Sequence, residues 1–98
     1  MNRAPPPKEP VTVERVAEWM LEELILRDGF LSEDVATIEI VRLFGGDFCG
    51  QDADGSFFIT QPLRDAFERL ALLSPRRILW DDAARAWRLG ALPADPYR

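Results

Sequence analysis

The stretch Arg77-Ile-Leu-Trp-Asp-Asp-Ala-Ala-Arg-Ala-Trp-Arg-Leu89 decides the fold that we expect for this chain. Two short, mostly apolar runs, each with one Trp, flank a polar turn, and this pattern predicts a β-hairpin. Three segments with helical periodicity precede it. Three helices, a short mid-chain β-hairpin and this closing C-terminal hairpin predict an α+β fold that is winged-helix-like.

The first helix is predicted between Thr12, a good N-cap, and Gly29, which suits a helix end. Its apolar residues recur at spacings of three and four from Val13 to Ile25, so they form one stripe that should face the core. Phe30-Leu31 reads as a short extended link to the next helix.

The second helix is predicted from Ser32 to the pair Gly45-Gly46, and its apolar residues wrap most of its circumference. Such a helix should be buried on more than one side, so we expect it to lie centrally. Asp54-Gly55 is a turn signal that predicts the mid-chain hairpin. Thr60 should cap the third helix, which ends at Ser74-Pro75.

These elements predict one domain over residues 12–91, with a disordered Pro-rich tail over 1–11 and a short tail over 92–98. A chain of 98 residues with 47% apolar content can bury a single core. We expect that core to contain Met20, Leu24, Ile40, Phe44, Phe67, Leu70 and at least one of Trp80 and Trp87.

The composition argues against most enzymes, because the chain has no His and none of its few Ser residues lies in Gly-x-Ser-x-Gly. We therefore expect no catalytic residues, no cofactor and no metal. One Cys, no long apolar run and no leader favour a cytoplasmic protein. Cys49, among Phe residues, reads as an inert buried thiol, and Asp81-Asp82 as turn residues rather than a catalytic pair.

Residues 50–61 imitate a calcium-binding loop, since Asp52, Asp54 and Gly55 stand at its third, fifth and sixth positions. However, Gly50 replaces the acid expected at the first position, and Gln61 replaces the bidentate Glu at the twelfth. Because most of the charge that would bind the ion is missing, we interpret this segment as a turn.

Charge is uneven, with five Lys and Arg against twelve Asp and Glu in residues 1–61, and seven against five in residues 62–98. The outer face of the third helix offers Arg64, Asp65, Glu68 and Arg69, whose spacing predicts two opposite-charge pairs. Self-neutralised pairs do not suit phosphate contacts. The remaining candidates for phosphate contacts are Arg76, Arg77, Arg85 and Arg88.

Trp19 and Leu26 lie off the apolar stripe of the first helix, about 220–240° from Val13 at 100° per residue. They should point away from the core, beside Arg15 and Glu22. An apolar centre with a charged rim is typical of partner surfaces, and a two-fold homodimer is its simplest use. The alternative is that the Pro-rich tail or the final hairpin covers both residues.

Several short motifs occur in a characteristic order over residues 15–89. They are Glu18-Trp-Met-Leu-Glu-Glu-Leu24, Asp28-Gly-Phe-Leu31, Leu43-Phe-Gly45, Asp54-Gly55, Ala66-Phe-x-x-Leu70 and the Trp80…Trp87 hairpin. In these the chain resembles a family of small uncharacterised bacterial proteins of the kind found on mobile gene cassettes. The chain departs from the family at Leu31-Ser-Glu33, where a Tyr-Gln-Glu-like segment is typical, and at Arg88, where a longer basic end is usual. The resemblance implies no known activity and no catalytic residues.

We therefore expect a non-enzymatic protein-interaction or adaptor module whose partner is another protein or a second copy of itself. The alternative is a winged-helix-type regulator that binds nucleic acid. We expect no membrane association.

Overall fold

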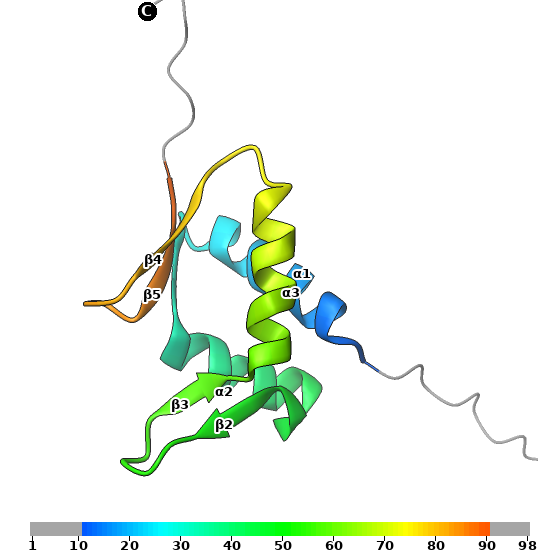
Figure 1. The fold of residues 1–98 in the computed structure, drawn as a ribbon, viewed down its shortest axis with the longest axis vertical. Coiled ribbons are helices and arrows are strands. Elements are labelled where there is room, and N and C mark those ends of the chain that lie inside the picture. Colours follow the sequence, from blue (N-terminus) through cyan, green and yellow to red (C-terminus); the bar gives the residue numbers. More distant parts are fainter. Residues whose placement is uncertain (1–10, 91–98) are drawn as a thin grey trace, which may run out of the picture.

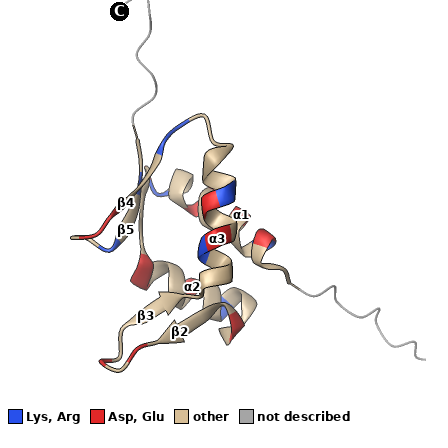
Figure 2. Cartoon of the chain, viewed as in Figure 1, with Lys and Arg blue, Asp and Glu red and all other residues tan. Residues whose placement is uncertain are grey.

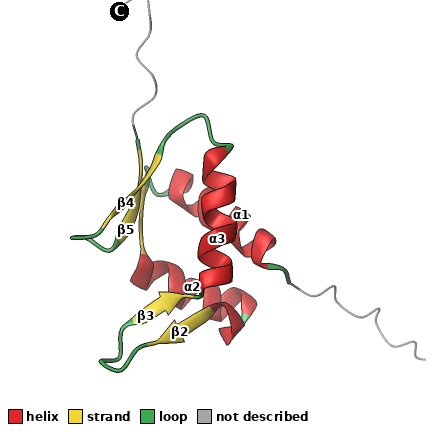
Figure 3. Ribbon diagram, viewed as in Figure 1, coloured by secondary structure: helices red, strands yellow, loops and turns green. Residues whose placement is uncertain are grey.

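The structure, a computed structural model, describes residues 11–90, so the tails expected at the two ends lie outside it except for Val11. Within residues 11–90 the chain forms three α-helices, a short 3₁₀ helix and two antiparallel sheets (Figures 1 and 3). The elements are α1 (Val13–Leu26), β1 (Phe30–Ser32), α2 (Glu33–Phe44), η1 (Gly46–Phe48), β2 (Cys49–Gln51), β3 (Phe57–Ile59), α3 (Gln61–Leu72), β4 (Ile78–Asp81) and β5 (Ala86–Leu89). This arrangement confirms the α+β fold and its closing hairpin.

Helix α1 begins as predicted, because the Thr12 hydroxyl accepts a hydrogen bond from the Arg15 backbone N–H at 3.1 Å. After its end the chain turns through Gly29, whose φ of 84° favours glycine. The side of α1 that carries Val16 and Leu24 is fully buried, and α1 packs against α3 and β5. Ile25, at the end of this predicted stripe, is exposed.

The segment expected to be an extended link is a strand. β1 pairs antiparallel with β5, which pairs in turn with β4, so the sheet order is β1-β5-β4. Leu31, Trp87 and Trp80 stand opposite one another across the three strands. The Trp87 ring meets Phe67 of α3 edge-on at a centroid distance of 5.5 Å, which fixes α3 on one face of the sheet.

The predicted mid-chain hairpin is confirmed as β2 and β3, which form a separate two-stranded sheet. Its turn is closed by the Ser56 N–H, which donates to the carboxylates of Asp52 and Asp54. Gly50 leaves room for the Phe58 ring, since a Cβ there would meet this ring at 2.5 Å and force it to move. The calcium-like segment is therefore a hairpin with its acids directed at its own backbone.

One core joins α1, α2, α3 and the larger sheet. Its buried apolar residues are Val16, Ala17, Trp19, Met20, Leu24, Leu31, Ala36, Ile40, Ile59, Leu63, Ala66, Phe67 and Trp87. Of the core residues expected from the sequence, Phe44 and Leu70 are half-buried at its edge, and Trp80 is partly exposed. The core therefore includes most of the residues that helical periodicity selected.

The expectation that α2 is buried on more than one side is wrong. Only the side that carries Ala36 and Ile40 is buried, whereas Val35, Ile38, Val41 and Leu43 are exposed. The reason is the position of α2 at the margin of the core, where neighbouring elements cover a single face. Apolar residues on the remaining circumference of α2 have no partner within residues 11–90.

Two further observations concern residues 11–90. No helix among them is both long enough and apolar enough to span a bilayer. No cluster of three or more His, Cys, Asp and Glu side chains in this part of the chain is arranged to hold a metal ion.

Candidate functional site

Trp19 does not point away from the core as predicted, because it is only 9% exposed. Its ring meets Phe44 of α2 edge-on, with 5.8 Å between centroids. Phe44 of helix α2 therefore packs on the side of α1 that carries Trp19. Leu26 is 76% exposed, and Arg15 and Glu22 form a loose ion pair at 3.9 Å on the surface.

Most of the four arginines predicted to contact phosphate have hydrogen-bond partners within the chain. Arg76 donates to the Gly90 carbonyl at 2.8 Å, and Arg88 donates to Asp81 at 2.8 Å while its guanidinium lies over the Phe30 ring. Arg85 is held by Glu33, as described below. Arg77 is exposed just before β4. Three of the four cations are therefore already engaged within the chain.

The most unusual polar group is Glu33, the first residue of α2, which is 1% exposed. Its carboxylate accepts hydrogen bonds from Arg64 of α3 at 2.9 Å, from Arg85 of the β4–β5 turn at 2.8 Å and from the Ile59 backbone N–H at 3.3 Å. A buried carboxylate is stable only with such partners. Glu33 thus connects the start of α2 to partners 26, 31 and 52 residues further along the chain. We call Glu33, Arg64 and Arg85 the Glu33 cluster.

Arg64 also stacks on the two Trp rings of the hairpin, at 5.2 Å from the Trp80 centroid and 5.7 Å from that of Trp87. Beside it lies a hollow of about 440 Å³ lined by Phe58, Trp80 and Asp82 together with the Glu33 cluster. The two guanidiniums are balanced here by the carboxylates of Glu33 and Asp82. The hollow therefore has little net attraction for an anion.

The charge of Glu33 acts on two of its neighbours. Hydrogen bonding to Glu33 raises the pKa of Arg85 above its usual range. Burial raises the pKa of the Cys49 thiol to about 11, and the negative charge of Glu33 adds to this shift. Cys49 is half-buried, so a thiol rather than a thiolate is present at neutral pH, in line with the inert cysteine expected from the sequence.

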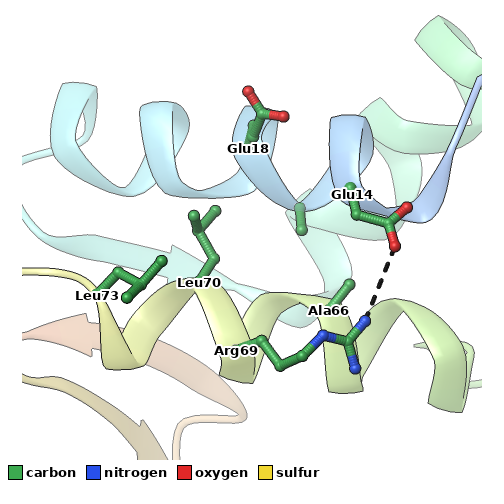
Figure 4. Close-up of a pocket in the computed structure, with 7 residues that line it drawn as sticks. Glu14, Glu18, Ala66, Arg69, Leu70 and Leu73 are labelled. Atoms are coloured by element: carbon green, nitrogen blue, oxygen red, sulfur yellow. Dashed lines mark ion pairs between the residues drawn. The ribbon is translucent and has the colours of Figure 1, made fainter.

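The opposite-charge pairs predicted along α3 are also not formed. Arg64 turns inward to Glu33, and Asp65 accepts a hydrogen bond from Gln61 at 2.8 Å. Arg69 instead reaches Glu14 of α1 at 3.9 Å, across a groove between the two helices with a volume of about 290 Å³ (Figure 4). Figure 4 shows Leu70 and Leu73 along this groove, and Leu73 is largely exposed because it follows the end of α3.

A second, more apolar hollow lies where α2 meets the β2–β3 hairpin. Ile38, Val41 and Phe57 line it, with Thr37 at its base, and its volume is about 210 Å³. The three apolar residues are exposed, Ile38 to 59%, although each could be buried in a core. We call Ile38, Val41 and Phe57 the α2–β3 surface. Sequence reasoning missed it because it took every apolar residue of α2 as core.

The surroundings of the α2–β3 surface are acidic. From Glu33 to Ile59 the chain has six Asp and Glu residues and one Arg, Arg42, which is paired with Glu39. Asp34 lies one helical turn before Ile38, and Asp52 and Asp54 stand in the turn that leads to Phe57. Figure 2 shows acidic residues at the end of this hairpin. The segments that form this surface thus carry net negative charge, and the lining of the hollow itself is apolar apart from Thr37.

No curated protein and no solved structure gives a significant match. The family of unknown function DUF6953 matches residues 12–89, a range that includes all the helices and strands described above. The chain therefore belongs to the family of unknown function DUF6953.

Proposed function

We propose that this chain is a non-enzymatic protein-interaction module that binds its partner through the α2–β3 surface. The observation that carries the proposal is the hollow of about 210 Å³ lined by the exposed side chains of Ile38, Val41 and Phe57. Exposed apolar patches on small proteins are characteristic of sites that another molecule covers. The Glu33 cluster, in contrast, is satisfied within the chain.

The partner should present an apolar residue or short apolar run flanked by Lys or Arg. The apolar part would fill the hollow, and the basic flanks would approach Asp34 and the acids of the β2–β3 turn. Complementary charge around an apolar centre selects the partner and speeds association. Two copies meeting through this surface would bring like charges together, so it does not suit self-association.

A selection from random short peptides displayed on phage tests the proposal. We expect the selected peptides to combine large apolar residues with Lys or Arg, and to shift the backbone resonances of Ile38, Val41 and Phe57 in NMR titrations. The substitution Ile38→Asp should abolish binding, because it places a charge in the hollow. A matched control is Leu72→Asp, which changes an exposed leucine on α3 and should leave binding unchanged.

The proposal is wrong if the peptides that are selected shift the α1–α3 groove instead, or if Ile38→Asp binds them as tightly as the original chain. Raising the salt concentration separates the two parts of the partner chemistry. Binding that falls with salt supports the basic flanks, whereas binding that is insensitive to salt but lost in Ile38→Asp supports only the apolar anchor.

A nucleic-acid-binding regulator is the alternative, and the winged-helix-like arrangement of α3 beside the β4–β5 hairpin favours it. Such a function needs cations on α3 and the hairpin that are free to meet phosphates. Arg64 and Arg85 are positioned there, but both are bound to Glu33. We therefore prefer the protein-interaction module.

A further inference from the structure

Strand β4 forms one edge of the three-stranded sheet, and its backbone groups on that side have no partner within residues 11–90. The Gly90 N–H donates to the Arg77 carbonyl, so Arg77 is hydrogen-bonded to the strand that contains β5. In an antiparallel pair every second residue is bonded in this way, so the next residues of β4 that bond to β5 are Leu79 and Asp81. Ile78 and Trp80 alternate with them. Their N–H and C=O groups therefore point away from β5, where a further strand could pair with them.

The sequence of this edge is complementary to itself when reversed. Arg76-Arg77 precedes the apolar run Ile78-Leu79-Trp80, and Asp81-Asp82 follows it. If a second β4 runs antiparallel with Leu79 opposite Leu79, then Arg77 stands opposite Asp81 and Arg76 opposite Asp82. Opposite charges in directly facing positions stabilise a strand pair, and like charges destabilise it.

The register that matches the charges also matches the hydrogen bonds. It places Ile78 opposite Trp80, and these are the two residues whose backbone groups point outward. Each would donate its N–H to the carbonyl of the other across the two-fold axis. A shift by one residue would break this match and would also move every side chain to the wrong face.

From these observations we propose that the chain forms a two-fold homodimer by antiparallel pairing of β4 with β4, which makes one six-stranded sheet. The side chains support the extension on both faces. On one face, Phe30, Arg88 and Leu79 lie side by side across β1, β5 and β4. Leu79 would contact Leu79 of the second copy at the two-fold axis. On the other, Trp80 would cover Ile78 of the second copy, and a two-fold contact of this kind closes on itself.

This contact goes beyond the proposed function, because it uses a different part of the molecule from the α2–β3 surface. The β4–β5 hairpin contacts α2 through Arg85 and α3 through Trp87, and β4 is its outer strand. Asp81 already accepts a hydrogen bond from Arg88 on one carboxylate oxygen and from the Ala84 N–H on the other, and each oxygen can accept one more, from Arg77 of the other copy. The edge is short, so we expect a dimer that dissociates on dilution.

Analytical ultracentrifugation over micromolar to millimolar concentrations tests the proposal. The original chain should show a monomer–dimer equilibrium, and amide hydrogen exchange at Ile78 and Trp80 should slow as concentration rises, while the Leu79 amide, already bonded within the sheet, changes little. Leu79→Lys should raise the dimer dissociation constant by at least about tenfold, since two like charges then meet at the axis. Leu79 is partly exposed in the monomer, so the fold should survive.

A charge exchange makes the test specific for this register. Arg77→Glu alone and Asp81→Lys alone should each weaken self-association by roughly tenfold, because both symmetry-related pairs become repulsive. Mixing the two variants should restore a dimer with one copy of each, since every facing pair is then of opposite charge. Far-UV circular dichroism verifies that both variants are folded before mixing.

Three outcomes would overturn the proposal. They are a monomer at millimolar concentration, a dimer that Leu79→Lys does not weaken, and a mixture of the charge variants that associates no better than either alone. Ile38→Asp serves as the control that separates this proposal from the proposed function. It should remove partner binding at the α2–β3 surface and leave the dimer intact.

Discussion

Helix α2 buries a carboxylate on one side and exposes isoleucine and valine on the other. Glu33 is 1% exposed, whereas Ile38, five residues later, is 59% exposed. This reverses the usual preference of these residue types. The buried carboxylate is explained within the chain, because Arg64, Arg85 and the Ile59 N–H satisfy it. The exposed apolar residues have no such explanation within residues 11–90, and for that reason we place the function on their side.

The largest expected effect comes from comparing two isoleucines of α2. Ile40→Ala should lower the free energy of unfolding by roughly 2–5 kcal/mol, because it leaves a cavity at a fully buried position. Ile38→Ala makes the same chemical change two residues away and should cost less than about 1 kcal/mol, since Ile38 is mostly in water. Urea denaturation measures both. Equal losses would show that Ile38 belongs to the core.

The buried carboxylate gives the next largest effect. Glu33→Gln should lower the free energy of unfolding by about 2 kcal/mol, the scale of hydrogen bonds to a charged group. This loss of free energy should be smaller than when a fully buried ion pair loses one partner, because Arg64 and Arg85 are partly exposed and water can solvate them. Thermal and urea denaturation report it. Glu39→Gln, at an exposed ion pair on the same helix, is the control and should have little effect.

A smaller effect should be seen at Cys49. Burial raises its pKa to about 11, and the charge of Glu33 contributes in the same direction. Glu33→Gln removes that negative charge, so the pKa of the thiol should fall and the thiolate fraction at pH 8 should rise several-fold. The pH dependence of the rate with a thiol reagent, measured where the variant is fully folded, gives the shift. An unchanged pH profile would mean that Glu33 does not act on Cys49.

The smallest expected effect is on nucleic acid. Because Arg64, Arg85 and Arg88 are paired within the chain, duplex DNA at physiological salt should bind with a dissociation constant of about 10⁻⁴ M or weaker. Fluorescence anisotropy with labelled duplexes measures this. Sequence-selective binding at nanomolar protein would instead support the nucleic-acid regulator and would mean that DNA displaces Glu33 from its arginines.

Much of the fold could be predicted from local pattern. The caps at Thr12 and Ser32 begin α1 and α2 with the side-chain hydrogen bonds that these residue types make. The Asp54-Gly55 turn and the Trp80…Trp87 pair formed the hairpins expected of them. These features depend on residues close in sequence, so a single chain is enough to reveal them.

The candidate site was harder to predict, because exposure is decided by distant segments. Periodicity placed Trp19 off the stripe of α1, but α2 crosses that side and buries it against Phe44. The same periodicity placed every apolar residue of α2 in the core, whereas the sheet and helices cover only one face of α2. Likewise, the spacing of Arg64 and Glu68 predicted a pair along α3, but Glu33, remote in sequence, offered a buried partner.

The sequence by itself determined where the helices and turns lie, the lack of histidine chemistry and the self-complementary charges around β4, because these follow from neighbouring residues. Only the tertiary structure decided which side of α1 and α2 meets water, and it added β1 to the sheet that leaves β4 at the edge. The physical reason is that burial depends on which elements pack together, and the residues around an apolar position do not identify the distant element that will cover it.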